Sequence, residues 1–110
     1  MSDMEDKLQK YKDDATAQLG KAGEANIDDA ILSELVNNLK LVIDNKDALY
    51  VAGSDPSEME TVRKNYVVKK LNIADQEKGA AAVTTVAKQM ADSRMKNRAA
   101  FYYLVKKALA

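Results

Sequence analysis

The apolar positions along the chain recur at intervals of three and four residues, which is the spacing of one face of an α-helix. Residues 3–19 carry a narrow stripe of this kind, and Gly20 and Gly23 follow it as stop signals. Residues 27–44 carry a wider apolar face, formed by Ile27, Ile31, Leu32, Leu35, Val36, Leu39, Val42 and Ile43. We therefore predict helices over both ranges, the second of them central to the core and capped by Asn26 or Asp28.

Capping signals and apolar spacing predict three further helices in the second half of the chain. Asp55 and Pro56 are typical of a helix start, so we place a helix over residues 56–71 and end it at Asn72 in the left-handed conformation. Asp75 can cap a helix over residues 76–91, and Ser93 can cap one over residues 94–109. The short apolar piece at residues 48–52 predicts either an extended segment or one turn of helix.

No alternating pattern of apolar and polar residues is present elsewhere, which argues against a sheet. The chain has 110 residues, of which 46% are hydrophobic and 5% aromatic, so it can form a core built mainly of aliphatic side chains and Ala. We expect an all-α fold, a compact bundle of four or five helices in one domain spanning residues 1–110. The only extended piece that we expect lies near residues 48–52.

The chain contains no Cys and no His, which excludes several classes of function. A disulfide framework, a thiolate nucleophile, a Cys-based zinc site and the Ser-His-Asp or Cys-His catalytic arrangements are all impossible. The acidic residues that begin at Asp44 do not match a calcium loop, because Lys46 and Leu49 occupy its third and sixth positions. We therefore expect no enzyme, no cofactor and no metal.

The two halves of the chain carry opposite charge, although the formal net charge is zero. Residues 1–60 hold 6 basic and 14 acidic side chains, a net charge of −8, whereas residues 61–110 hold 11 basic and 3 acidic ones, a net charge of +8. The candidate anion-binding residues of the basic half are Arg63, Lys64, Lys69, Lys70, Arg94, Lys96, Arg98, Lys106 and Lys107.

Three interpretations of this polarity remain open. The ordinary one is that acidic and basic helices pack side by side with loosely paired, solvated charges, each pair contributing only about 0–1 kcal/mol. In the second, the basic half binds an anion such as nucleic acid, a phosphorylated ligand or an acidic protein. In the third, two copies of the chain attract one another.

Arg94 and Arg98 lie one turn apart on the last predicted helix, on the same side as Phe101 and Val105. Charged side chains on the face of a helix that packs against the core need a physical explanation. Their stems can lie along apolar surface, or they can pair with carboxylates of the acidic half. Alternatively, the two guanidinium groups can bind a phosphate or a carboxylate from outside, because Arg binds both with two hydrogen bonds.

We expect a cytoplasmic protein without a membrane partner. The segment Met1–Asp6 is acidic where a secretory signal would be basic, and the longest apolar run, Ala99–Val105, is too short to span a bilayer.

Two stretches of the sequence are distinctive. One is Ser54–Tyr66 followed by Lys69–Leu71, and the other is Asn97–Leu104. Together they resemble a family of small, mostly bacterial proteins named domain of unknown function 2853, over roughly residues 45–106. The resemblance implies a small helical fold and a bacterial, cytosolic setting, and it transfers no catalytic residue. It directs attention to five polar residues of the two stretches, which are Arg63, Asn65, Asn97, Arg98 and Tyr103.

The sequence thus favours a non-enzymatic interaction module that binds a protein partner or a second copy of itself. The alternative is binding of nucleic acid or another polyanion through the predicted helices at 56–71 and 94–109. A third alternative is an enzyme that uses Asp, Glu, Lys or Tyr chemistry.

Overall fold

The computed structural model describes residues 3–24, 26–51, 56–91 and 95–109, and its elements are almost all helical. In chain order they are α1 (Asp3–Lys21), α2 (Asp29–Asn37), the 3₁₀ helix η1 (Lys40–Val42), α3 (Lys46–Leu49), β1 (Tyr50–Val51), α4 (Pro56–Val62), the π-helix η2 (Arg63–Val68), α5 (Gln76–Gln89), β2 (Lys96–Asn97) and α6 (Arg98–Leu109). The prediction of an all-α bundle is confirmed.

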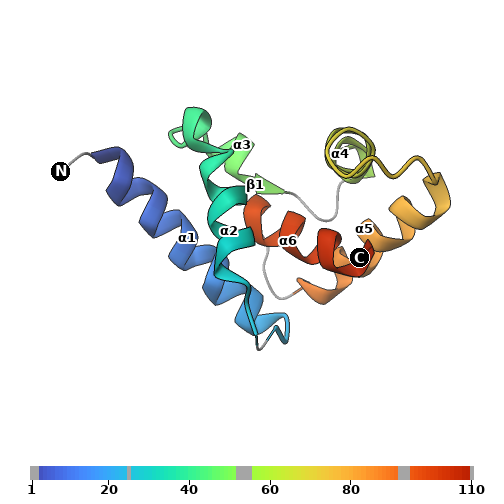
Figure 1. Cartoon of the computed structure of the whole chain (residues 1–110), viewed down its shortest axis with the longest axis horizontal. Helices are drawn as coiled ribbons and strands as arrows, with labels where there is room; N and C mark the ends of the chain where they lie inside the picture. Colours follow the sequence, from blue (N-terminus) through green and yellow to red (C-terminus); the bar gives the residue numbers. More distant parts are fainter. Residues whose placement is uncertain (1–2, 25, 52–55, 92–94, 110) are drawn as a thin grey trace.

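Helix α6 lies at the centre of the molecule, between α1 and α2 on one side and α5 on the other (Figure 1). It buries residues around most of its circumference, namely Ala99, Ala100, Phe101, Tyr103, Leu104 and Val105. The Ala side chains are small, so neighbouring helices can approach α6 closely there. We had predicted that the helix at residues 27–44 would be central to the core. In the structure α6 takes the central position and α2 packs against it.

Several predicted caps are present. The Asp28 side chain accepts hydrogen bonds from the amides of Ala30 and Ile31 at the start of α2, and Asp75 accepts one from the amide of Lys78. Asn72 has a φ of 57° and Gly23 a φ of 91°, as expected for left-handed residues after a helix. The predicted Asp55 and Ser93 caps lie outside the described residues.

The predicted helix at residues 27–44 is interrupted. Its α-helical part ends at Asn37, and the chain continues through Asn38 into the separate 3₁₀ turn η1. Two consecutive Asn residues explain the break, because their side chains compete with the backbone for hydrogen bonds and are poor helix formers. The apolar spacing continues past this point, so periodicity alone did not reveal the end of the helix.

The predicted helix at residues 56–71 begins at Pro56 as expected, but at Arg63 it changes from an α-helix to a π-helix. In η2 the amide of Lys69 bonds the carbonyl of Lys64, five residues back, and the amide of Leu71 bonds that of Tyr66. This wider turn allows Arg63, Tyr66 and Val67 to be buried together. Segments of π-helix are rare and occur frequently at functional sites.

The predicted helix at residues 94–109 begins later, at Arg98, because Lys96 and Asn97 form the short strand β2. This strand pairs antiparallel with β1, with Tyr50 opposite Asn97 and Val51 opposite Lys96. The extended piece near residues 48–52 therefore exists, preceded by the helical turn α3, but its partner strand was not predicted. Arg94 lies outside the described residues.

Candidate functional site

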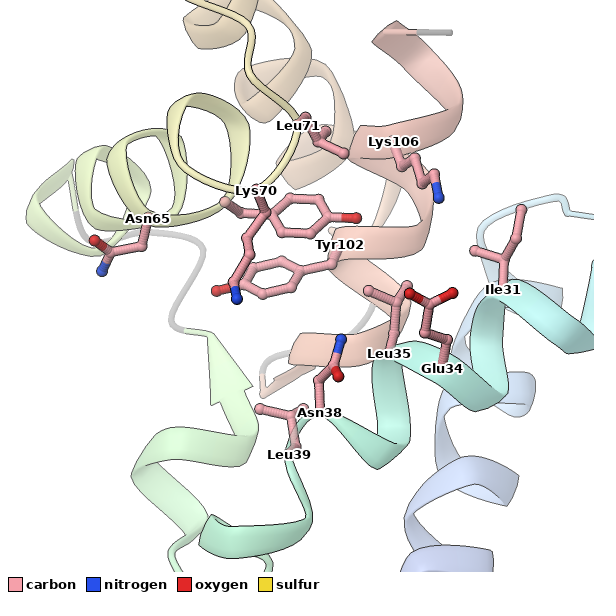
Figure 2. Close-up of a pocket in the computed structure, with 11 residues that line it drawn as sticks. Ile31, Glu34, Leu35, Asn38, Leu39, Asn65, Lys70, Leu71, Tyr102 and Lys106 are labelled. Carbon is pink, nitrogen blue, oxygen red and sulfur yellow. The ribbon is translucent and has the colours of Figure 1, made fainter.

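A pocket of about 520 Å³ opens between α2, η2 and α6 (Figure 2). Its volume falls within the range of roughly 300–1,000 Å³ that is common for small-molecule sites. The residues that line it are Ile31, Glu34, Leu35, Asn38, Leu39, Asn65, Tyr66, Lys70, Leu71, Tyr102 and Lys106. They come from segments far apart in the chain, so the pocket exists only in the folded protein.

Two stacked tyrosines form part of the pocket wall. The rings of Tyr66 and Tyr102 lie nearly parallel, with centroids 4.1 Å apart and an angle of 9° between their planes. The π-turn places Tyr66 on α6 in this way, and its ring is buried. Burial raises the pKa of the Tyr66 hydroxyl well above its ordinary value, and Tyr102 and Glu34 raise it further. Tyr66 is therefore a neutral hydrogen-bond donor and acceptor at physiological pH.

Arg98 holds Tyr102, one of the residues that line the pocket. Its guanidinium donates hydrogen bonds to the Ala48 carbonyl at 2.6 Å, to the Tyr102 hydroxyl at 2.9 Å and to Glu58 at 2.8 Å. Burial lowers the pKa of this group, but Tyr102 and Glu58 outweigh that effect and keep the pKa above its ordinary value. Arg98 thus pairs with a carboxylate of the acidic half, one of the two ordinary roles considered for it.

Two other candidate cations also have carboxylate partners. Arg63 forms an ion pair with Glu60 at 2.5 Å, and Lys107 forms one with Glu24 at 2.6 Å. Lys96 is buried, and burial lowers the pKa of its ammonium group. Arg63 and Lys107 are therefore paired within the chain, and Lys96 is buried in it.

The remaining described candidates gather on η2, the turn after it, and α6. Within the described ranges, the ammonium groups of Lys64, Lys69, Lys70 and Lys106 make no ion pair. The first three of these side chains are exposed and Lys106 is half-buried. Lys70 and Lys106 line the pocket, whereas Lys64 and Lys69 line a second hollow of about 400 Å³ beside η2.

Comparison with known proteins places the chain in a family. The family described as "Protein of unknown function (DUF2853)" matches residues 10–110, which is nearly the whole chain. The chain belongs to the DUF2853 family. A search of curated proteins found no match to the chain.

The DUF2853 match extends the resemblance seen in the sequence, which covered only residues 45–106. The polar residues of its two distinctive stretches serve different purposes in the structure. Asn97 is buried and bonds α1, and the hydroxyl of Tyr103 accepts a hydrogen bond from the amide of Asp28 at 2.7 Å. Asn65 lines the pocket beside Lys70. These groups stabilise the fold around the pocket instead of forming one cluster.

The sequence did not reveal the part of the pocket that α2 contributes. Glu34 on α2, and Asn38 and Leu39 just after it, were not among the candidate residues, because one helix over residues 27–44 was expected to face the core. The consecutive Asn37 and Asn38 were the available signal that the helix ends there.

The structure also bears on other kinds of site. No group of three or more acidic side chains that could hold a metal ion is present among the described residues. In the same portion of the chain, none of the helices combines the length and the apolar character needed to cross a lipid bilayer.

Proposed function

We propose that this protein is a non-enzymatic interaction module that associates with a second copy of itself through oppositely charged ends. The observation that carries the proposal is the grouping of Lys64, Lys69 and Lys70, which make no ion pair within the described residues, at and just after η2. All three side chains are exposed, so they can meet carboxylates of a partner outside the chain.

The opposite charge lies at the other end of the molecule. The molecule measures 44 Å along its longest axis, and the start of α1 and the η2 segment lie toward opposite ends of that axis (Figure 1). The first turn of α1 carries Asp3, Glu5 and Asp6, all exposed. One copy therefore presents an acidic end that is complementary to the basic end of the next copy.

A contact between two different ends of identical chains is heterologous, so it can extend beyond a pair. Complementary charges of this kind raise the association rate and select the partner, and salt weakens them because the Debye length shortens. We therefore expect reversible association at low ionic strength and monomers at high ionic strength.

Multi-angle light scattering after size-exclusion chromatography, at low and at molar salt, tests this directly. The basic-end variant K64E/K69E/K70E and the acidic-end variant D3K/D6K should each be monomeric at low salt, and an equimolar mixture should associate again. K88E, at an exposed position near the other end of α5, is the control and should associate like the unmodified protein. A monomeric protein at low salt and high concentration would refute the proposal.

A second measurement tests the alternative function, which is polyanion binding. Fluorescence anisotropy with labelled mixed-sequence DNA and RNA should show only weak binding to the unmodified protein. If the unmodified protein stays monomeric but binds nucleic acid with an affinity that falls steeply with salt and is lost in K64E/K69E/K70E, then the basic end binds polyanions and self-association is wrong.

A further inference from the structure

The hydroxyl of Tyr66 is the starting point for a second role of this molecule. Tyr66 is only 5% exposed, yet its hydroxyl makes no hydrogen bond to any other described residue. Its stacking partner differs, since the Tyr102 hydroxyl accepts a hydrogen bond from Arg98. No buried side-chain nitrogen or oxygen of the described residues lacks a hydrogen-bond partner, so this hydroxyl reaches the open space of the pocket, where it can bond a ligand.

Opposite charges face each other across the same pocket. Glu34 on α2 and Lys106 on α6 point toward one another (Figure 2), but no ion pair joins them. Lys70 adds a second ammonium group to the lining. A purely anionic ligand would meet Glu34, and a purely cationic one would meet two lysines. The charges are therefore complementary to a ligand that carries both signs.

The rest of the lining is apolar and limits the size of the ligand. The apolar lining consists of Ile31 and Leu35 from α2, Leu39 just beyond it, and Leu71 after η2. A volume of about 520 Å³ holds a molecule with an apolar body and a small polar head. The pocket shares Lys70 with the exposed lysine surface proposed for self-association, but Lys64 and Lys69 lie outside it.

We infer that the pocket between α2, η2 and α6 binds a small amphipathic zwitterion, namely a free α-amino acid with an apolar side chain. The ligand carboxylate lies against Lys106, its ammonium group bonds Glu34, and the Tyr66 hydroxyl bonds the head group. The apolar side chain packs on Ile31, Leu35, Leu39 and Leu71. Binding at this site goes beyond the proposed self-association and does not depend on it.

Three related probes test the requirement for both charges. L-phenylalanine carries both, 3-phenylpropanoate lacks the ammonium group, and 2-phenylethylamine lacks the carboxylate. In ¹H–¹⁵N correlation spectra of the D3K/D6K variant at low salt, which keeps every pocket residue but lacks the acidic end, phenylalanine should shift the amides of Glu34, Tyr66 and Lys106. Each of the other probes should bind about tenfold more weakly, the effect of losing one hydrogen bond between charged groups.

Matched variants test which protein side chain recognises each charge of the ligand. E34Q should weaken phenylalanine binding about tenfold without weakening 3-phenylpropanoate, whereas K106M should weaken both. Y66F keeps the ring stack and should weaken phenylalanine binding severalfold. E77Q and K88M make the same changes at exposed positions of α5 and should leave binding unchanged.

The native dispersion of each variant's spectrum shows that it is folded. Absence of shifts up to the solubility limit of phenylalanine would overturn the inference. Shifts centred away from the pocket, or equal loss of phenylalanine and 3-phenylpropanoate in E34Q, would overturn it as well. Because these spectra are recorded on a variant that lacks the acidic end needed for self-association, failure here leaves the light-scattering test unaffected.

Discussion

The guanidinium of Arg98 on α6 and the carboxylate of Glu58 on α4 form an ion pair of 2.8 Å, although 40 positions separate them in the chain. Their side chains are 13% and 27% exposed. The same guanidinium also bonds the carbonyl of Ala48 and the hydroxyl of Tyr102. Arg98 therefore joins the segment before β1, the α4 helix and the tyrosine stack, and it holds one side of the pocket in place.

Removal of Arg98 should destabilise the fold. R98A leaves Glu58 and the Ala48 carbonyl without their partner, so we expect the free energy of unfolding to fall by about 2–4 kcal/mol in chemical denaturation. K64A removes an exposed cation that makes no ion pair, and it should change the free energy of unfolding by less than about 0.5 kcal/mol. If R98A and the unmodified protein are equally stable, then the contacts of Arg98 make no net contribution to the free energy of unfolding.

Asn97 performs two separable tasks at the start of α6. Its side-chain oxygen caps the helix by accepting a hydrogen bond from the amide of Ala100, and its side-chain amide donates to the Tyr11 carbonyl and to Asp14. N97A removes both and should cost about 2–4 kcal/mol, measured by urea denaturation.

The variant N97D separates these tasks, because it keeps the cap but places a carboxylate beside Asp14. We expect N97D to be at least as unstable as N97A at neutral pH. A near-native N97D would indicate that only the cap matters.

Stability should fall when the pH rises above 10. Burial raises the pKa of Tyr11 and of Tyr66 above the ordinary value of 10.0, so the folded protein keeps these protons while the unfolded chain releases them. Below pH 10 both states are protonated and the two groups contribute no pH dependence. The melting temperature followed by circular dichroism should therefore decrease from about pH 10 upward.

Tyrosine absorbance provides the control for this prediction. The alkaline titration followed at the phenolate band should show delayed ionisation of part of the tyrosines in the folded protein. In Y66F the decrease in melting temperature should be shallower, because one proton fewer is involved. Melting temperatures that are constant to well above pH 10 would contradict the assignment.

Gly79 on α5 allows the π-helix to approach. A Cβ atom built at Gly79 would lie 3.0 Å from a methyl carbon of Val67 and 3.4 Å from the Cγ of Arg63. We expect G79V to destabilise by about 1–3 kcal/mol through overpacking.

In a V67A background the closest methyl is absent, and G79A should then stabilise by up to about 1 kcal/mol through its higher helix propensity. A double-mutant cycle measured by thermal denaturation gives the coupling between the two positions. Additive effects of V67A and G79A would show that the close approach has no energetic consequence.

Local signals in the sequence were sufficient for the helix ends at which neighbouring residues interact. Asp28 and Asp75 cap through amides two or three residues ahead, and Asn72 and Gly23 adopt left-handed conformations that their own side chains permit. The apolar periodicity was also sufficient for the all-α class. These features depend on contacts within a few residues, so they can be read along the chain.

The positions at which the predicted helices begin late or change to a π-helix depend on contacts with residues far away in the chain. The strand at Lys96 and Asn97 forms because β1 and α1 supply hydrogen-bond partners, including the Gln18 side chain at 2.7 Å from the Asn97 amide. The widened turn of η2 accompanies the stacking of Tyr66 on Tyr102 from α6 and the close approach of Gly79 on α5. Neither partner is visible in the local pattern.

The sequence by itself determined the helical class, several caps, the opposite charge of the two halves and the absence of His and Cys chemistry. Only the tertiary structure decided which cations are already paired and which side chains line a pocket. Arg98 and Lys70 are both basic residues of the second half, but Glu58 neutralises the first and no described carboxylate pairs with the second. The physical reason is that ion pairing and pocket formation depend on distances in space, which folding sets between residues far apart in the chain.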